Sequence, residues 1–339
     1  TISCINIKDH LSRFDLLTRN YTLSPIRWGG GTEITIRTKA FFNFENHLLA
    51  QVIFHEAIIN EKVFEVYSLT EQDKSMVLAK EGECIGGLSV LHEARLEYLA
   101  ETEATKEFPL DDIREFIEAL PTKDFSVEEV SKITDGFPTL YQGNNDLEEF
   151  CIRHQVNPIN VWYWFKNSKV IPQQRMRTLA MEFLADMIRE ILMEDEDGII
   201  PLVPNAGEKV LLDRIEEKFM EKGFSSAQYS SFDSVLGRPI HEYLNNHFFQ
   251  ELSDHLNLFM YLPKTPFIWH LSSGPEQGFD CYLIIYKWSR DGLLRLRSVY
   301  VEHRERSLIN RRSDLADNES AEAQNEKDRI FKQLQEIED

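Results

Sequence analysis

The spacing of its apolar residues most constrains what this chain can fold into, because helical intervals dominate. Apolar side chains recur at such intervals from Phe41 to Val66, and again from Asp328 to Ile337. Two other short runs, Phe267–Leu271 and Phe279–Tyr286, have the composition and the flanking turn residues of paired strands. We therefore expect a predominantly helical α+β fold with a small sheet near 265–287 and a C-terminal helix.

Shifts in composition and charge divide the 339 residues into four expected regions. Near the N-terminus, Gly29, Gly30 and Gly31 precede the run Ile34–Ile36, which predicts a loop leading into a strand. After Arg312 the chain becomes acidic and polar, which predicts a solvated linker before a terminal helix whose partner lies elsewhere. The regions are 1–100, an N-terminal α+β region with a helical spacer; 101–195, an acidic helical region; 196–312, a C-terminal α+β domain; and 313–339, the linker and terminal helix.

Several classes of protein are disfavoured by what the sequence lacks. No stretch approaches the roughly 18 apolar residues of a membrane span and no secretion signal is evident, so a cytoplasmic protein without membrane contact is expected. Neither a nucleophile elbow nor a Gly-rich S-adenosylmethionine loop is evident. Asn157–Asn160 lacks the second proline and the aromatic of the Asn-Pro-Pro-Tyr motif that holds a flipped adenine. We therefore expect no catalytic residue, and whether the chain is part of an enzyme stays open.

The four cysteines stand singly along the sequence, without the paired spacing of a zinc site or the density of a disulfide framework. Free thiols and no metal site are therefore expected. The cysteines are Cys4, Cys84, Cys151 and Cys281.

Acidic and basic side chains are segregated along the chain. The sequence holds 57 acidic and 37 basic residues, and its net charge of -20 by itself disfavours a polyanionic partner. Residues 51–150 carry 23 acidic and 8 basic side chains, a pattern typical of solvated helix faces or of a docking face for a basic partner. Two windows, 151–181 and 287–312, are instead basic. Because salt screens surface fields beyond about 8 Å, these windows remain candidates for contact with DNA.

The first basic window overlaps a helix-turn-helix pattern at 146–171. Two helices are expected over 146–154 and 158–166, and the second has a proline at its first position. Such a hairpin either places its second helix in a groove of DNA or is purely structural, and the sequence leaves both open. The residues expected in the core in either case are Val161, Trp164 and Phe165.

Four sequence blocks follow one another in the last third of the chain: Asp197–Leu202, Gly237–Ile240 leading to Phe248-Phe249, Pro266–Gly274 with Gly278-Phe279, and Leu293–Tyr300. In their order and rough spacing they resemble the C-terminal region of PglX-type adenine-specific DNA methyltransferases. These enzymes belong to BREX phage-defence systems and are related to type IIG restriction-modification enzymes. The upstream segment Val63–Asp73 is similar to one that follows the catalytic domain in this family. The catalytic motifs of the family are absent from the sequence.

The resemblance implies methylation of adenine N6, with S-adenosylmethionine bound by a catalytic part outside this chain. We therefore expect a non-catalytic, target-recognition-like part or subunit that engages DNA within a BREX-like or restriction-modification complex and holds no cofactor itself. Its expected partners are double-stranded DNA, the catalytic methyltransferase domain or subunit, and other defence-system proteins. The alternative is a structural subunit that docks a basic partner through the acidic tract. The residues expected at DNA are Arg153, Trp162, Tyr163, Lys166, Lys169, Arg175, Arg177, Lys287, Arg290, Arg295 and Arg297.

Overall fold

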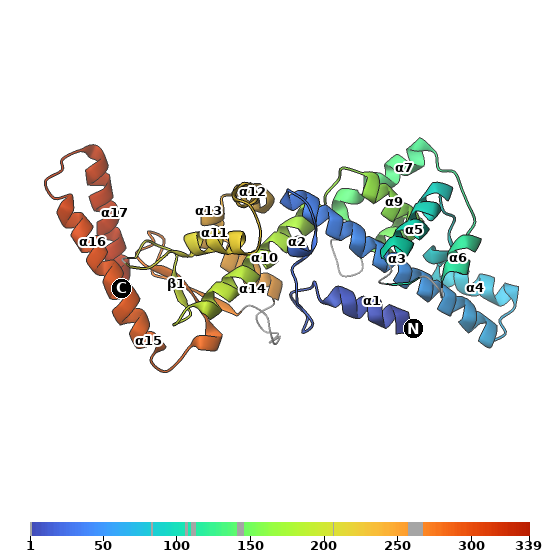
Figure 1. Cartoon of the computed structure of the whole chain (residues 1–339), viewed down its shortest axis with the longest axis horizontal. Coiled ribbons are helices and arrows are strands. Elements are labelled where there is room, and N and C mark those ends of the chain that lie inside the picture. Colours follow the sequence, from blue (N-terminus) through green and yellow to red (C-terminus); the bar gives the residue numbers. More distant parts are fainter. Residues whose placement is uncertain are drawn as a thin grey trace. The chain divides into compact units, whose positions relative to one another are not determined.

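The computed structural model divides the chain into two compact units, residues 1–179 and 180–339, and helix α10 (Gln173–Glu194) contains the division (Figure 1). Helices dominate, and a small antiparallel sheet lies in the second unit, which confirms the predicted fold class. The expected boundaries after residues 100 and 312 fall inside helices α5 (His92–Thr105) and α16 (Glu302–Asp314). The structure describes residues 2–82, 84–105, 108–109, 113–140, 146–205, 207–256 and 267–339, so Pro266 of the third sequence block lies outside it.

Helix α3 (Ile34–Val66) is the central element of the first unit. The helical spacing predicted from Phe41 onward is confirmed, as part of one helix of 33 residues. Its buried residues end at Ala57, so the last turns of the helix leave the core. The elements that pack along it are α1 (Ile2–Ser12), α2 (Pro25–Trp28), η1 (Ile85–Gly87), α6 (Arg114–Ala119), α8 (Asp146–His154) and α9 (Pro158–Asn167).

The strand predicted at Ile34–Ile36 is wrong. These residues form the first turn of α3. Ile34 is fully buried, and the Thr38 hydroxyl donates a hydrogen bond to the Ile34 carbonyl at 2.8 Å. Packing therefore overrides the β propensity of these branched residues. The glycine-rich loop before them is held by the Arg37 guanidinium, which donates to the Gly29 carbonyl at 2.9 Å.

The sheet of the second unit contains three strands in the order β1-β3-β2, all antiparallel. The two predicted strands are confirmed as β2 (Ile268–Ser272) and β3 (Asp280–Ile284). Sequence analysis missed the third, β1 (Ile199–Pro201), which is only three residues long. Because β3 is central and entirely buried, it positions the elements on both faces of the sheet.

Helices cover both faces of this sheet. On one face, Cys281 and Leu283 pack with Leu296 and Tyr300. On the other, Tyr282 donates from its hydroxyl to the Leu244 carbonyl at 2.5 Å. The helices and turns of the second unit, besides α10 and α16, are α11 (Leu211–Glu221), α12 (Ser226–Leu236), α13 (Ile240–Asn246), α14 (Phe248–Leu256), η3 (Ile285–Lys287), α15 (Gly292–Arg295), the π-helix η4 (Leu296–Val301) and α17 (Ala321–Glu338).

The C-terminal helix predicted from the sequence is α17, but its partner lies within the same unit and not elsewhere. It pairs with α16 in a helical hairpin (Figure 1), whose core contains Leu308, Leu315 and Ile330. Its Glu336 carboxylate also accepts hydrogen bonds from the backbone amides of Glu276 and Gly278, at 2.8 and 3.2 Å. The expected linker is correspondingly short, because α16 continues to Asp314.

Candidate nucleic-acid interface

The predicted helix-turn-helix exists, but its second helix is a core helix. Helices α8 and α9 occupy the predicted positions, and Asn157 caps α9 with Pro158 at its first position. Val161, Trp164 and Phe165 are buried, as expected. Most other residues of α9 are buried as well, and a single edge of the helix is half-buried or exposed. A recognition helix needs an exposed face for the groove of DNA, which α9 lacks. The structural alternative for this hairpin therefore holds.

Two asparagines explain why α9 is held so firmly. The Asn157 amide donates to the Leu88 carbonyl at 2.9 Å, while its oxygen accepts from the Ile159 amide at 3.0 Å. Asn160 accepts from the Leu91 amide at 2.8 Å and donates to the Ser89 carbonyl at 3.0 Å. The polar residues that begin α9 thus serve to tie it to the 86–91 segment.

Trp162 was expected to pack on DNA, and this prediction is wrong. None of its surface is exposed, and its ring lies 5.2 Å from that of Tyr98 and 5.6 Å from that of His47. A base or sugar therefore has no access to either ring face. Burial lowers the pKa of neighbouring His47 to about 4, against weaker raising effects from Glu101 and the Tyr98 backbone. The imidazole is thus neutral at physiological pH.

Carboxylates surround the exposed edge of α9. The Lys166 ammonium lies 2.9 Å from Glu97 and also bonds Glu101. Partial burial, together with the charges of Glu93 and Glu97, raises the pKa of the Tyr163 phenol. Lys166 is therefore already neutralised, and phosphates would meet repulsion beside Tyr163.

The other cations of the first window fall into two groups. Arg175 lies 3.0 Å from the Glu45 carboxylate and is partly buried. Arg153, Lys169 and Arg177 are exposed, and none forms an ion pair with another described residue. These three come from different elements: Arg153 from α8, Lys169 from the connection after α9, and Arg177 from α10.

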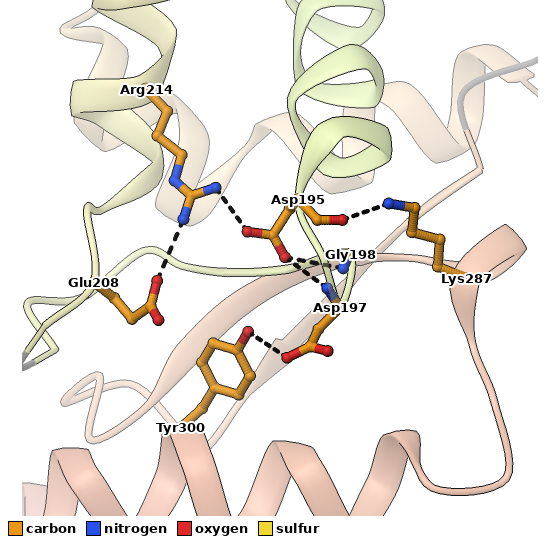
Figure 2. Close-up of polar contacts among 7 residues, drawn as sticks. All are labelled: Asp195, Asp197, Gly198, Glu208, Arg214, Lys287 and Tyr300. Atoms are coloured by element: carbon orange, nitrogen blue, oxygen red, sulfur yellow. Dashed lines mark hydrogen bonds and ion pairs between the residues drawn. The ribbon is translucent and has the colours of Figure 1, made fainter.

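In the second window, two cations hold the fold together, and one of them, Lys287, is drawn in Figure 2. The Lys287 ammonium donates to the backbone carbonyl of Asp195. The Arg295 guanidinium lies 2.8 Å from Asp197, although nearly half of its side chain is exposed. Both therefore anchor the turn between α10 and β1.

Asp195 organises this turn. Its Oδ1 accepts from the backbone amides of Asp197 and Gly198 at 3.1 and 3.0 Å, and its Oδ2 accepts from Arg214 at 2.8 Å (Figure 2). The left-handed conformation of Gly198, with φ of 68°, allows the chain to turn sharply into β1. The first sequence block is thus a structural turn that joins α10, β1 and α11.

The π-helix η4 is held by the same turn. The Tyr300 hydroxyl donates to Asp197 at 3.1 Å (Figure 2), and the Tyr300 carbonyl accepts from the Asn205 amide at 3.1 Å. Burial and the carboxylates of Asp195 and Asp197 raise the pKa of this phenol. Helices α15 and α16 are thereby joined through η4 into one helical segment, 292–314, with a fixed position on the sheet.

Exposed cations of the second window lie on this helical segment and directly before it. Arg290 and Arg297 are exposed, and within the described residues neither forms an ion pair. Farther along, α16 lines an open groove of about 650 Å³ with His303, Arg306 and Asn310. These groove residues were not among those expected to contact DNA, although their spacing of three and four places them on one helical face.

In comparisons with known proteins, no family model matches the sequence, and no curated protein is significantly similar to it. In the described part of the chain, none of the helices is both long enough and apolar enough to cross a bilayer. Those same residues contain no cluster of His, Cys, Asp and Glu side chains suited to holding a metal ion.

Proposed function

We propose that this chain is a non-catalytic, DNA-engaging part or subunit of an adenine-specific DNA methyltransferase in a cytoplasmic phage-defence system. The observation that carries the proposal is the helical segment 292–314, with Arg290 just before it. It combines exposed arginines with an open groove that His303, Arg306 and Asn310 line. The resemblance of the four sequence blocks supplies the type of enzyme. S-adenosylmethionine would be bound by the catalytic part.

The electrostatics of the segment suit a duplex backbone. Arg290 and Arg297 have no ion-pair partner in the described part of the chain, so there each can bind a phosphate without breaking an existing ion pair. His303 and Asn310 in the groove add donors for phosphate or sugar oxygens. Such contacts fix the position of the protein on DNA without reading the base sequence, which fits a part that supports recognition by the assembled enzyme.

Reversing the two unpaired arginines tests the proposal. We expect Arg290→Glu with Arg297→Glu to weaken duplex binding about tenfold or more and to reduce the slope of log K against log salt by about two, because two phosphate contacts are lost. Fluorescence anisotropy with a labelled duplex, measured on the assembled complex at several salt concentrations, gives both values. Circular dichroism checks that the fold is retained.

The matched control is Lys62→Glu with Lys132→Glu, which makes the same change in net charge at exposed positions of the first unit. If both double variants weaken binding equally, the effect is one of overall charge, and the proposed interface is wrong. Unchanged binding by the arginine variant would also reject it.

A further inference from the structure

The hairpin formed by the end of α3 and helix α4 (Glu71–Glu81) exposes an unusual amount of apolar surface. Val66, Tyr67 and Met76 have 80, 74 and 66% of their surfaces exposed. Val63 and Val77 are also exposed, on the two helices of the same hairpin. Exposed apolar side chains of this size leave both helices of the hairpin poorly covered by the rest of the first unit.

Helix α4 lacks the packing that normally stabilises a helix of its length. It has 11 residues, and none of those whose side chains are described is buried. A capping box secures its start, since Thr70 accepts from the Asp73 amide at 3.2 Å and the Asp73 carboxylate accepts from the Thr70 amide at 3.0 Å. A cap alone contributes about 1 kcal/mol, whereas short helices in proteins depend mainly on packing. Helix α4 therefore depends on packing that the first unit itself does not supply.

A pocket of about 510 Å³ lies at the base of the hairpin. Ala57, Phe64, Leu78 and Phe116 form its apolar walls, and the half-buried phenylalanines give it depth. An apolar anchor, such as a leucine or phenylalanine side chain, suits such a cavity.

The charges around the pocket select the class of partner. Glu61 and Glu65 lie at its edge. The one lysine in its lining, Lys74, is 2.6 Å from the Glu71 carboxylate and so is already paired. The surrounding tract, residues 51–150, holds 23 acidic against 8 basic side chains. These carboxylates repel nucleic acid and anionic lipid, and they attract a protein segment that carries Lys or Arg.

We propose that the α3–α4 hairpin is a docking site for a basic amphipathic segment of a partner protein, which inserts an apolar side chain into the pocket between α3 and α4. The segment supplies the packing that α4 lacks, and its cations face Glu61 and Glu65. This site lies in the first unit and does not depend on the proposed contact between the second unit and DNA.

The test uses the full chain and two labelled synthetic peptides of equal length and hydrophobicity. One has leucines at helical spacing among lysines, and in the other glutamates replace the lysines. We expect saturable anisotropy binding of the basic peptide alone, with slower amide hydrogen exchange in 71–81 when it is bound. Phe64→Ser with Leu78→Ser, which removes two apolar walls of the pocket, and separately Glu61→Lys with Glu65→Lys, should each weaken binding about tenfold or more.

Matched controls separate this site from general stickiness. Val127→Ser removes an apolar residue outside the pocket, since Val127 is 86% exposed, and Asp124→Lys with Glu128→Lys makes the same charge reversal on exposed positions around helix α7 (Val127–Thr134). Both should bind like the unmodified chain. The proposal is overturned if the basic peptide does not bind, if the acidic peptide binds equally well, or if hairpin and control variants lose the same affinity.

Discussion

Replacing Trp162 by alanine will lower the free energy of unfolding by about 3–5 kcal/mol, the usual cost of removing a fully buried large aromatic side chain. The indole packs against Tyr98 and His47, and the firmly tied α9 cannot move far to fill the cavity. Urea denaturation monitored by circular dichroism measures the change. DNA binding by the folded protein should stay the same, because no part of this ring reaches solvent.

The neighbouring substitution Tyr163→Ala is the control, since Tyr163 lies on the half-buried edge of the same helix. It should cost much less stability than Trp162→Ala. If the two substitutions are equally mild, and Trp162→Ala reduces DNA affinity in a fully folded protein, the core assignment of α9 is wrong.

Acidification will destabilise the first unit through His47, by about 3 kcal/mol between pH 6.5 and pH 4. Burial lowers the pKa of this imidazole from its ordinary value of 6.5 to about 4 in the folded protein. The unfolded chain therefore takes up the proton first, and stability falls as the pH decreases through this range. Below about pH 4 the folded state also binds the proton, and the loss from this group stops growing.

Urea denaturation at a series of pH values measures this effect, and His47→Gln isolates it from the titration of the carboxylates. We expect this variant to have a flatter dependence of unfolding free energy on pH between 4 and 6.5, whatever its stability at pH 7. His303→Gln is the control, because His303 is exposed in the second unit. Identical pH profiles for the unmodified chain and His47→Gln would contradict the assignment.

Local signals in the sequence were sufficient to predict much of the architecture. Proline and asparagine at the start of α9 and the helical period of α3 place these helices correctly, and the turn between 272 and 279 identifies the β2–β3 pair. The strand predicted at Ile34 is wrong because this residue is fully buried as part of the first turn of α3, and local propensity does not record such burial. Strand β1 was missed because three residues give almost no periodic signal.

The candidate site was harder to predict, because charge windows do not show which cations are already paired. Lys166 and Arg295 each meet carboxylates that are distant in the sequence, such as Glu101, 65 residues from Lys166. The asparagines at the start of α9 bond carbonyls about 70 residues away in the sequence. These bonds hold α9 in the core, where it cannot enter a groove of DNA. Sequence gives the number of positive charges in a window, whereas the tertiary structure decides how many of them a phosphate can reach.

The continuity of α10 has a practical consequence for separating the two units. Met176 and Leu179 are buried on the first side of the division, and Leu184 and Ile188 are buried on the second. Cleavage between residues 179 and 180 would split one helix and expose apolar side chains on both fragments. Proteases favour extended backbone, and the boundary between the two units offers none because it lies inside α10. Limited proteolysis is therefore poorly suited to separating the units at residues 179–180.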